Sequence, residues 1–153
     1  MRKKCAIAQF LVLLVFGAGL FPVLAADSFF GKVTEVRSAD VVVVDYGKGQ
    51  YVVRIVGVSV PKEGPITAKA KQFVTDLVLG KVIRARFQGE QKGEMVSQLF
   101  VGDPGEDVGL ELVRAGLARR QQGLDPEFGY KYGELLKAEK EAREGKRGLW
   151  TEP

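Results

Sequence analysis

Five short runs of residues with strand character lie between residues 29 and 101, and they constrain the fold of this chain more than any other feature. Residues 29–37 alternate, residues 41–44 are four consecutive valines, and residues 51–58 are again rich in Val and Ile. The turn Ser38-Ala39-Asp40 and the two-glycine segment 45–50 separate these runs, which predicts a three-stranded meander. Residues 82–87 and 95–101, on either side of a loop at 89–93, predict a second hairpin.

Helical patterns occur in three places, and their order relative to the strands decides the architecture. Between the third and fourth strands, apolar residues recur at i, i+3, i+4, i+7 and i+8, which predicts a helix that ends at Gly80. They are Ala70, Phe73, Val74, Leu77 and Val78. Two more helices are predicted near residues 110–117 and 132–142, and Trp150 is expected to fold back onto the core. This order predicts an α+β fold, a five-stranded Greek-key β-barrel of the OB type with three helices.

The first 26 residues have the pattern of a signal peptide. Arg2, Lys3 and Lys4 precede an almost wholly apolar stretch at residues 11–24, and small residues at the end of that stretch suit cleavage after Ala25 or Ala26. We therefore expect export to the periplasm or the medium, with residues 27–153 forming the folded domain. The alternative is an uncleaved membrane anchor at residues 6–26. Cys5 lies before the apolar run, where a lipoprotein cysteine would follow it.

Composition excludes several kinds of chemistry and weakens one kind of binding. The chain has no histidine and one cysteine, so histidine-based triads, zinc sites and disulfide frameworks are excluded. Removing residues 1–26 takes away three of the 23 basic residues and none of the 19 acidic ones, so the domain is nearly neutral. Strong non-specific binding to nucleic acid then requires segregated charge. Basic residues do gather near the C-terminus, but glutamates are interleaved with them, which favours a solvated helix face.

Four sequence blocks follow one another in a characteristic order over residues 30–150. They are Gly31-Lys32-Val33 before Asp40, the string Val53-Arg54-Ile55-Val56-Gly57-Val58 before Pro61, the string Leu112-Val113-Arg114-Ala115-Gly116-Leu117-Ala118, and Ala138-Glu139 before Gly148-Leu149-Trp150. With the order of elements, these blocks resemble the thermonuclease family, the staphylococcal nuclease-like phosphodiesterases that cut DNA and RNA with calcium. The resemblance implies the OB fold of that family for residues 30–150.

The resemblance also implies which residues would carry the chemistry. In the family, carboxylates hold a calcium ion, a glutamate activates the attacking water, and two arginines clamp the phosphate. Asp40 matches a metal-binding aspartate, and Arg54, fourteen residues later, matches the first arginine. Three other positions differ from the family pattern. Ser59 replaces the second metal-binding carboxylate, Lys62 replaces the glutamate base, and Glu94 replaces the second arginine.

These three differences predict a loss of catalysis. A protonated lysine cannot accept the proton of water, and Glu94 would repel a phosphodiester. Asp40 alone predicts weak calcium binding at best. Arg54 either clamps phosphate or forms an ion pair with Asp40 or Glu63, and Glu63 could also replace the missing base. Gln122 and Leu124 stand near the places of the family's base-stacking tyrosines, which puts base stacking in doubt.

Three functions remain open on these residues. The first is a catalytically degenerate, exported, monomeric domain that binds nucleic acid or another polyanion. Its binding residues would be Arg54, Lys62, Lys92 and Arg84. The second is an active calcium-dependent phosphodiesterase for DNA or RNA that uses Asp40 and Arg54 with a partner such as Glu63. The third is a protein-interaction module, because a fold alone does not dictate function.

Overall fold

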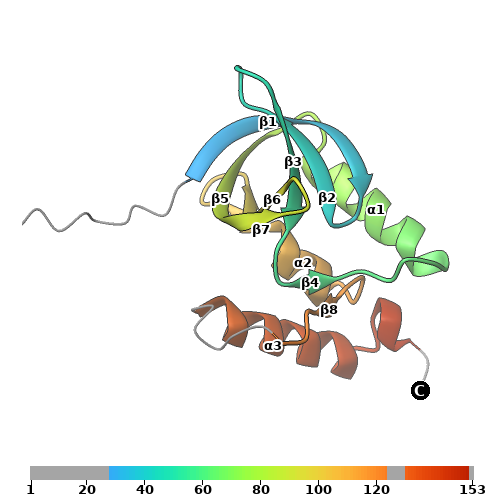
Figure 1. Cartoon of the computed structure of the whole chain (residues 1–153). Coiled ribbons are helices and arrows are strands. Elements are labelled where there is room, and N and C mark those ends of the chain that lie inside the picture. The colour runs from blue at the N-terminus through green and yellow to red at the C-terminus, as the bar shows by residue number, and fades with distance from the viewer. Residues whose placement is uncertain (1–27, 124–129, 152–153) are drawn as a thin grey trace, which may run out of the picture.

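The computed structural model of the chain describes residues 28–123 and 130–151. The predicted barrel is confirmed. Its strands are β1 (Ser28–Ser38), β2 (Val41–Asp45), β3 (Gln50–Ile55), β5 (Val82–Gln91) and β6 (Glu94–Val101). They are ordered β3-β2-β1-β5-β6, and a parallel pairing of β3 with β6 closes the sheet on itself. Figure 1 shows this barrel above α3 (Tyr130–Glu144), with α2 (Val108–Arg114) and the short strands β4 (Val58–Ser59) and β8 (Arg119–Arg120) between them.

The long strand β1 curves enough to pair with two neighbouring strands. Its first half pairs with β5 and its second half with β2, and register shifts interrupt the β2 pairing after Val33 and after Val36. Such irregularities increase bending and twist, which a small closed barrel needs. At Gly31 a Cβ atom would lie 2.5 Å from Val44 Cγ1, so only glycine fits where the two strands approach.

The helices begin and end at residues whose chemistry suits those positions. α1 (Pro65–Val78) starts with proline, and the chain then turns at Gly80 with a φ of 74°. In α2 (Val108–Arg114), the Asp107 carboxylate accepts a hydrogen bond of 3.0 Å from the Leu110 N–H and so caps the helix. α3 (Tyr130–Glu144) leads to a short 3₁₀ turn (Gly148–Trp150).

One hydrophobic cluster joins the barrel interior to the helices. Its members include Val33, Val42, Val44, Val53, Ile83 and Leu99 from the strands, Ala70, Val74 and Val78 from α1, Leu112 and Val113 from α2, and Leu135 and Ala138 from α3. The predicted apolar stripe of α1 therefore does face the core. Trp150 is not a member of this cluster; its half-buried ring lies instead beneath the guanidinium groups of Arg119 and Arg143.

Three local features differ from the prediction. The third strand ends at Ile55, and β4 (Val58–Ser59) is a separate pair with β8 (Arg119–Arg120). The predicted loop at 89–93 is mostly strand, because β5 continues to Gln91 and only Lys92 and Gly93 make the turn. A two-residue strand, β7 (Glu106–Asp107), extends the sheet beyond β6.

The C-terminal segment is fixed to the rest of the molecule by a close contact between Gly116 and Gly148. The Leu149 N–H donates to the Gly116 carbonyl at 2.8 Å, and a Cβ atom on Gly116 would lie 2.2 Å from the Arg147 carbonyl oxygen.

None of the helices in the described ranges has the length and apolar character that a membrane crossing requires. The predicted signal peptide lies outside the described residues.

Candidate functional site

Asp40 and Arg54 lie side by side on the barrel wall. Asp40 is in the turn between β1 and β2, and Arg54 is on β3 opposite Val41, the residue after that turn. The Ile55 N–H donates to the Asp40 carbonyl at 2.8 Å, so the backbone holds the two positions together. Arg54 Nη1 donates to Asp40 Oδ2 at 2.6 Å. The structure thus supports one of the two ion-pair alternatives raised for Arg54.

Glu94 contacts the same guanidinium group from a third strand. It is the first residue of β6, which the parallel β3–β6 pairing brings beside Arg54. Arg54 Nε donates to Glu94 Oε2 at 2.7 Å, and Nη2 lies 2.6 Å from the same oxygen. All three guanidinium nitrogens are therefore engaged by two carboxylates. We call Asp40, Arg54 and Glu94 the ion triad.

The ion triad is partly exposed and carries a net negative charge. The side chains of Asp40, Arg54 and Glu94 keep 25%, 36% and 26% of their surface accessible. Two carboxylates and one guanidinium leave a formal charge of −1. A phosphate that approached Arg54 would have to displace a carboxylate from the guanidinium group, and it would meet net repulsion. Chemically, this arrangement ties the β1–β2 turn, β3 and β6 together.

The oxygen donors at this place do not fit a calcium ion. Both Asp40 oxygens already accept hydrogen bonds, Oδ2 from Arg54 and Oδ1 from the Ser38 hydroxyl at 2.7 Å. Calcium requires about six to eight oxygens with several carboxylates among them. Within residues 28–123 and 130–151, no group of three or more acidic residues is placed to hold a metal ion.

Within the described residues, no hydrogen bond or ion pair joins Lys62 or Lys92 to the ion triad. Lys62 is exposed in the bend after β4, Lys92 is exposed in the β5–β6 turn, and neither forms an ion pair within the described part of the chain. Glu63 is also exposed and does not reach Arg54 through any hydrogen bond or ion pair of the described residues.

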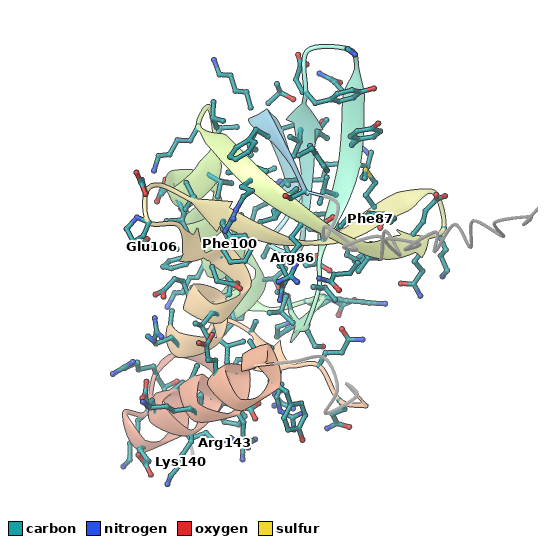
Figure 2. The ribbon with its side chains drawn as sticks, turned by 90° about the vertical axis from the view of Figure 1, so that its left-hand side faces the viewer. Arg86, Phe87, Phe100, Glu106, Lys140 and Arg143 are labelled. Carbon is teal, nitrogen blue, oxygen red and sulfur yellow. The ribbon has the colours of Figure 1, made fainter. Side chains whose placement is uncertain are left out.

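Arg84 lies elsewhere on the barrel. On β5 it is opposite Phe30 of β1 and Phe100 of β6, with its guanidinium carbon 4.7 Å from the Phe100 ring centre. Phe100, labelled in Figure 2, is six residues after Glu94 on β6, or about 20 Å at the usual rise of a strand. The structure thus separates Arg84 from Arg54, although both were predicted to bind one ligand.

Sequence reasoning missed the role of Glu94. It interpreted Glu94 only as an acid that repels substrate, and the structure adds that Glu94 binds Arg54. A signal was present, because a residue at the position of the second family arginine should lie near the first. An acid in that position is therefore placed to pair with Arg54.

A five-stranded barrel closed by a parallel β3–β6 contact and followed by two C-terminal helices defines an OB-type domain of the nuclease kind. The family model for "Staphylococcal nuclease homologue" matches residues 52–152 of this chain. The chain therefore belongs to the staphylococcal nuclease family, whose members are calcium-dependent in general.

Two similar proteins are both named as endonucleases. An "Uncharacterized endonuclease" of Escherichia coli O157:H7 is 32% identical over 146 residues, which is 93% of this chain and 88% of that protein. A "Probable endonuclease lcl3" of Pyrenophora tritici-repentis is 31% identical over 112 residues, 66% of this chain and 41% of that protein. Both relatives support the family.

Proposed function

We propose that this chain is a staphylococcal nuclease-like domain that binds nucleic acid but does not cleave it by the calcium-dependent route of the family. One observation carries the proposal. Arg54, which would clamp the phosphate, has all three guanidinium nitrogens bound to Asp40 and Glu94. A clamp whose charge is already neutralised cannot respond to charge that develops on phosphate oxygens.

The other substitutions support the same conclusion. Removing one preorganised donor from a transition-state site costs about 10²–10³ in rate. Here Glu94 replaces a donor with an acid, Lys62 replaces the proton acceptor, and Ser59 replaces a metal-binding carboxylate. We expect any calcium bound at Asp40 to be held too weakly to organise a substrate.

The names of the relatives favour a second function, an active endonuclease, and a digestion assay separates the two. Purified domain is incubated with plasmid DNA and with RNA in calcium or in chelator. We expect no calcium-dependent cleavage above the level of an Asp40→Ala, Arg54→Ala double variant. Calcium-dependent cleavage by the wild-type domain that this double variant loses, while circular dichroism shows the variant to be folded at the assay temperature, would refute the proposal.

A gain-of-function variant tests the stated cause of inactivity. Ser59→Asp, Lys62→Glu and Glu94→Arg together restore the family residues and release Arg54 from one carboxylate. We expect this variant to cleave DNA in calcium at least about 10²-fold faster than the wild type, because a donor and a base are regained. The matched control carries Ser59→Asp and Lys62→Glu but keeps Glu94, and it should stay nearly inert.

Nucleic-acid binding is the part of the proposal that the family membership supports. The third possibility, a protein-interaction module, differs from it in salt dependence. Contacts to phosphate weaken steeply as salt rises, whereas apolar protein contacts do not. The test measures how much labelled single-stranded DNA the immobilised domain retains as salt rises. A sharp fall between about 50 and about 200 mM salt supports binding through phosphates.

We also propose that the domain is exported. The proposal rests on the sequence of residues 1–26, with basic residues, an apolar stretch and small residues in that order. Expression of the full chain in a Gram-negative host, followed by fractionation and N-terminal sequencing, tests it. We expect periplasmic protein that begins at Ala26 or Asp27, and a product that keeps residues 1–26 in the membrane fraction would contradict it.

A further inference from the structure

A groove of about 630 Å³ lies between β8 and α3, at the opposite end of the domain from the β2–β3 hairpin. Its size is typical of ligand-binding depressions, which measure about 300–1,000 Å³. Four cationic side chains and an exposed leucine are among the residues that line it. The cations are Arg120 from β8 and Lys137, Lys140 and Arg143 from α3, and the leucine is Leu136. Lys140 and Arg143 are labelled on α3 in Figure 2. We call this the α3 groove.

Helical spacing places the groove residues on one face of α3. Gly133, Leu136, Lys140 and Arg143 follow one another at intervals of three or four residues. Ten residues separate the first from the last, which corresponds to about 15 Å of helix. The face is therefore a continuous strip with a glycine at one end, where the absent side chain leaves the groove open.

The charge that the α3 groove offers to a ligand is positive. Glu139 is the acidic residue in its lining, and only 11% of its side chain is accessible. Its carboxylate accepts a hydrogen bond from the Arg120 N–H at 3.4 Å and lies 3.6 Å from Arg143 Nη2. Glu139 is therefore engaged in contacts within the protein, and the cationic side chains form the accessible rim of the groove.

The two lysines are available to an anionic ligand. Lys137 and Lys140 lie 3.9 and 3.8 Å from Glu141 and Glu144, and their side chains are 79% and 75% accessible. Exposed pairs of this kind contribute little to stability. A phosphate can replace these partners at little cost.

The two arginines are held in place by aromatic rings. The guanidinium carbon of Arg143 lies 4.2 Å from the Trp150 ring centre, and that of Arg120 lies 5.1 Å from the Tyr132 ring centre. Contact with a ring face orients a guanidinium group while its N–H edge can still donate. Among the described residues, Arg120 Nε is buried and has no hydrogen-bond partner.

We propose that the α3 groove is the nucleic-acid site of this domain and that it binds single strands. This inference rests on the proposed nucleic-acid binding and moves it from the net-negative ion triad to α3. The cations contact phosphates, and Leu136, 48% exposed, offers apolar surface to an unstacked base. A duplex keeps its bases stacked inside and cannot use that apolar floor.

The test compares two double variants that remove the same charge from different helices. Lys137→Ala with Lys140→Ala removes two rim lysines, and Lys69→Ala with Lys71→Ala removes two exposed lysines from α1. Binding of a labelled oligothymidylate is measured by fluorescence anisotropy at several salt concentrations, and a duplex of equal length is measured in parallel. Thermal unfolding of each variant checks that the fold is kept.

We expect the α3 variant to bind about tenfold more weakly. Its salt slope should fall by about 1.4, because each phosphate contact on a single strand contributes about 0.7. The α1 variant should keep the wild-type affinity, and the duplex should bind more weakly than the single strand.

Other results overturn different parts of the argument. If the wild-type domain binds and the α3 variant binds equally well, or both variants lose affinity equally, the α3 groove is not the site. If the duplex binds as tightly as the single strand, the single-strand assignment is wrong. If the wild-type domain does not bind at low salt, the proposed nucleic-acid binding fails as a whole.

Discussion

Removing the Arg54 guanidinium tests whether the ion triad contributes to stability. Arg54→Ala deletes hydrogen bonds of 2.6–2.7 Å to Asp40 and Glu94 and leaves a carboxylate in the β1–β2 turn and one on β6 without their shared cation. Charge-assisted hydrogen bonds contribute about 1.5–3 kcal/mol when sheltered, and exposed ion pairs about 0.2–1 kcal/mol. Because Arg54 is 36% accessible, we expect a total loss of about 2 kcal/mol.

This loss is measurable by urea unfolding followed by circular dichroism. For a domain of this size, about 2 kcal/mol corresponds to a fall in Tm of roughly 6–10 °C. The triple variant Arg54→Ala, Asp40→Ala, Glu94→Ala should be more stable than Arg54→Ala alone, since it leaves no unpaired carboxylates. Lys69→Ala, at an exposed position on α1, is the control and should change little.

Two results would refute the reasoning. Arg54→Ala with a free energy of unfolding within about 0.5 kcal/mol of wild type would mean that the ion triad has no structural role, since that is the range of ordinary surface substitutions. A triple variant less stable than Arg54→Ala would mean that the two carboxylates are stabilised by groups other than the arginine.

Two further predictions concern a glycine contact and a tyrosine pair. Gly116→Ala should destabilise the domain by more than about 2 kcal/mol in chemical denaturation, because the φ of Gly116 is +72° and the new Cβ would meet the Arg147 carbonyl. The control is Gly133→Ala in α3, where the new Cβ meets no atom within 4 Å. It should stabilise the domain by about 0.5–1 kcal/mol. A hydrogen bond with Tyr51 raises the pKa of Tyr46 above its ordinary value of 10.0. The stabilisation from this bond is therefore present below pH 10.0 and lost as Tyr46 ionises above it, and Tyr51→Phe should shift the phenolate absorbance of Tyr46 to lower pH.

The barrel could be predicted because each of its strands has a local pattern. Alternation and valine runs indicated β1, β2 and β3, and the stripe of α1 indicated a helix that packs on the core. The pair β4–β8 could not be predicted in this way. Each strand has two residues, too few for a period, and the pair forms because a distant segment passes beside Val58.

The site was predictable in part for a different reason. Resemblance to a family located Asp40 and Arg54, and the structure places them in direct contact. The contact from Glu94 to Arg54 spans 40 residues of sequence and depends on the parallel closure of β3 against β6. Periodicity predicts strands but not which strands close a barrel, so this partner needed the structure.

The contact with Glu94 changes the role that can be inferred for Arg54. In the family pattern an arginine at this position implies a phosphate ligand, but here the same side chain pairs with two carboxylates, one from the β1–β2 turn and one from β6. Arg54 can then be required for folding without ever touching a substrate. A loss of function in Arg54→Ala would not by itself identify an active site, because the variant also loses stability. Glu94→Gln separates the two roles: it frees part of the guanidinium, so phosphate binding at Arg54 would rise while stability falls, whereas a purely structural arginine gives only the fall.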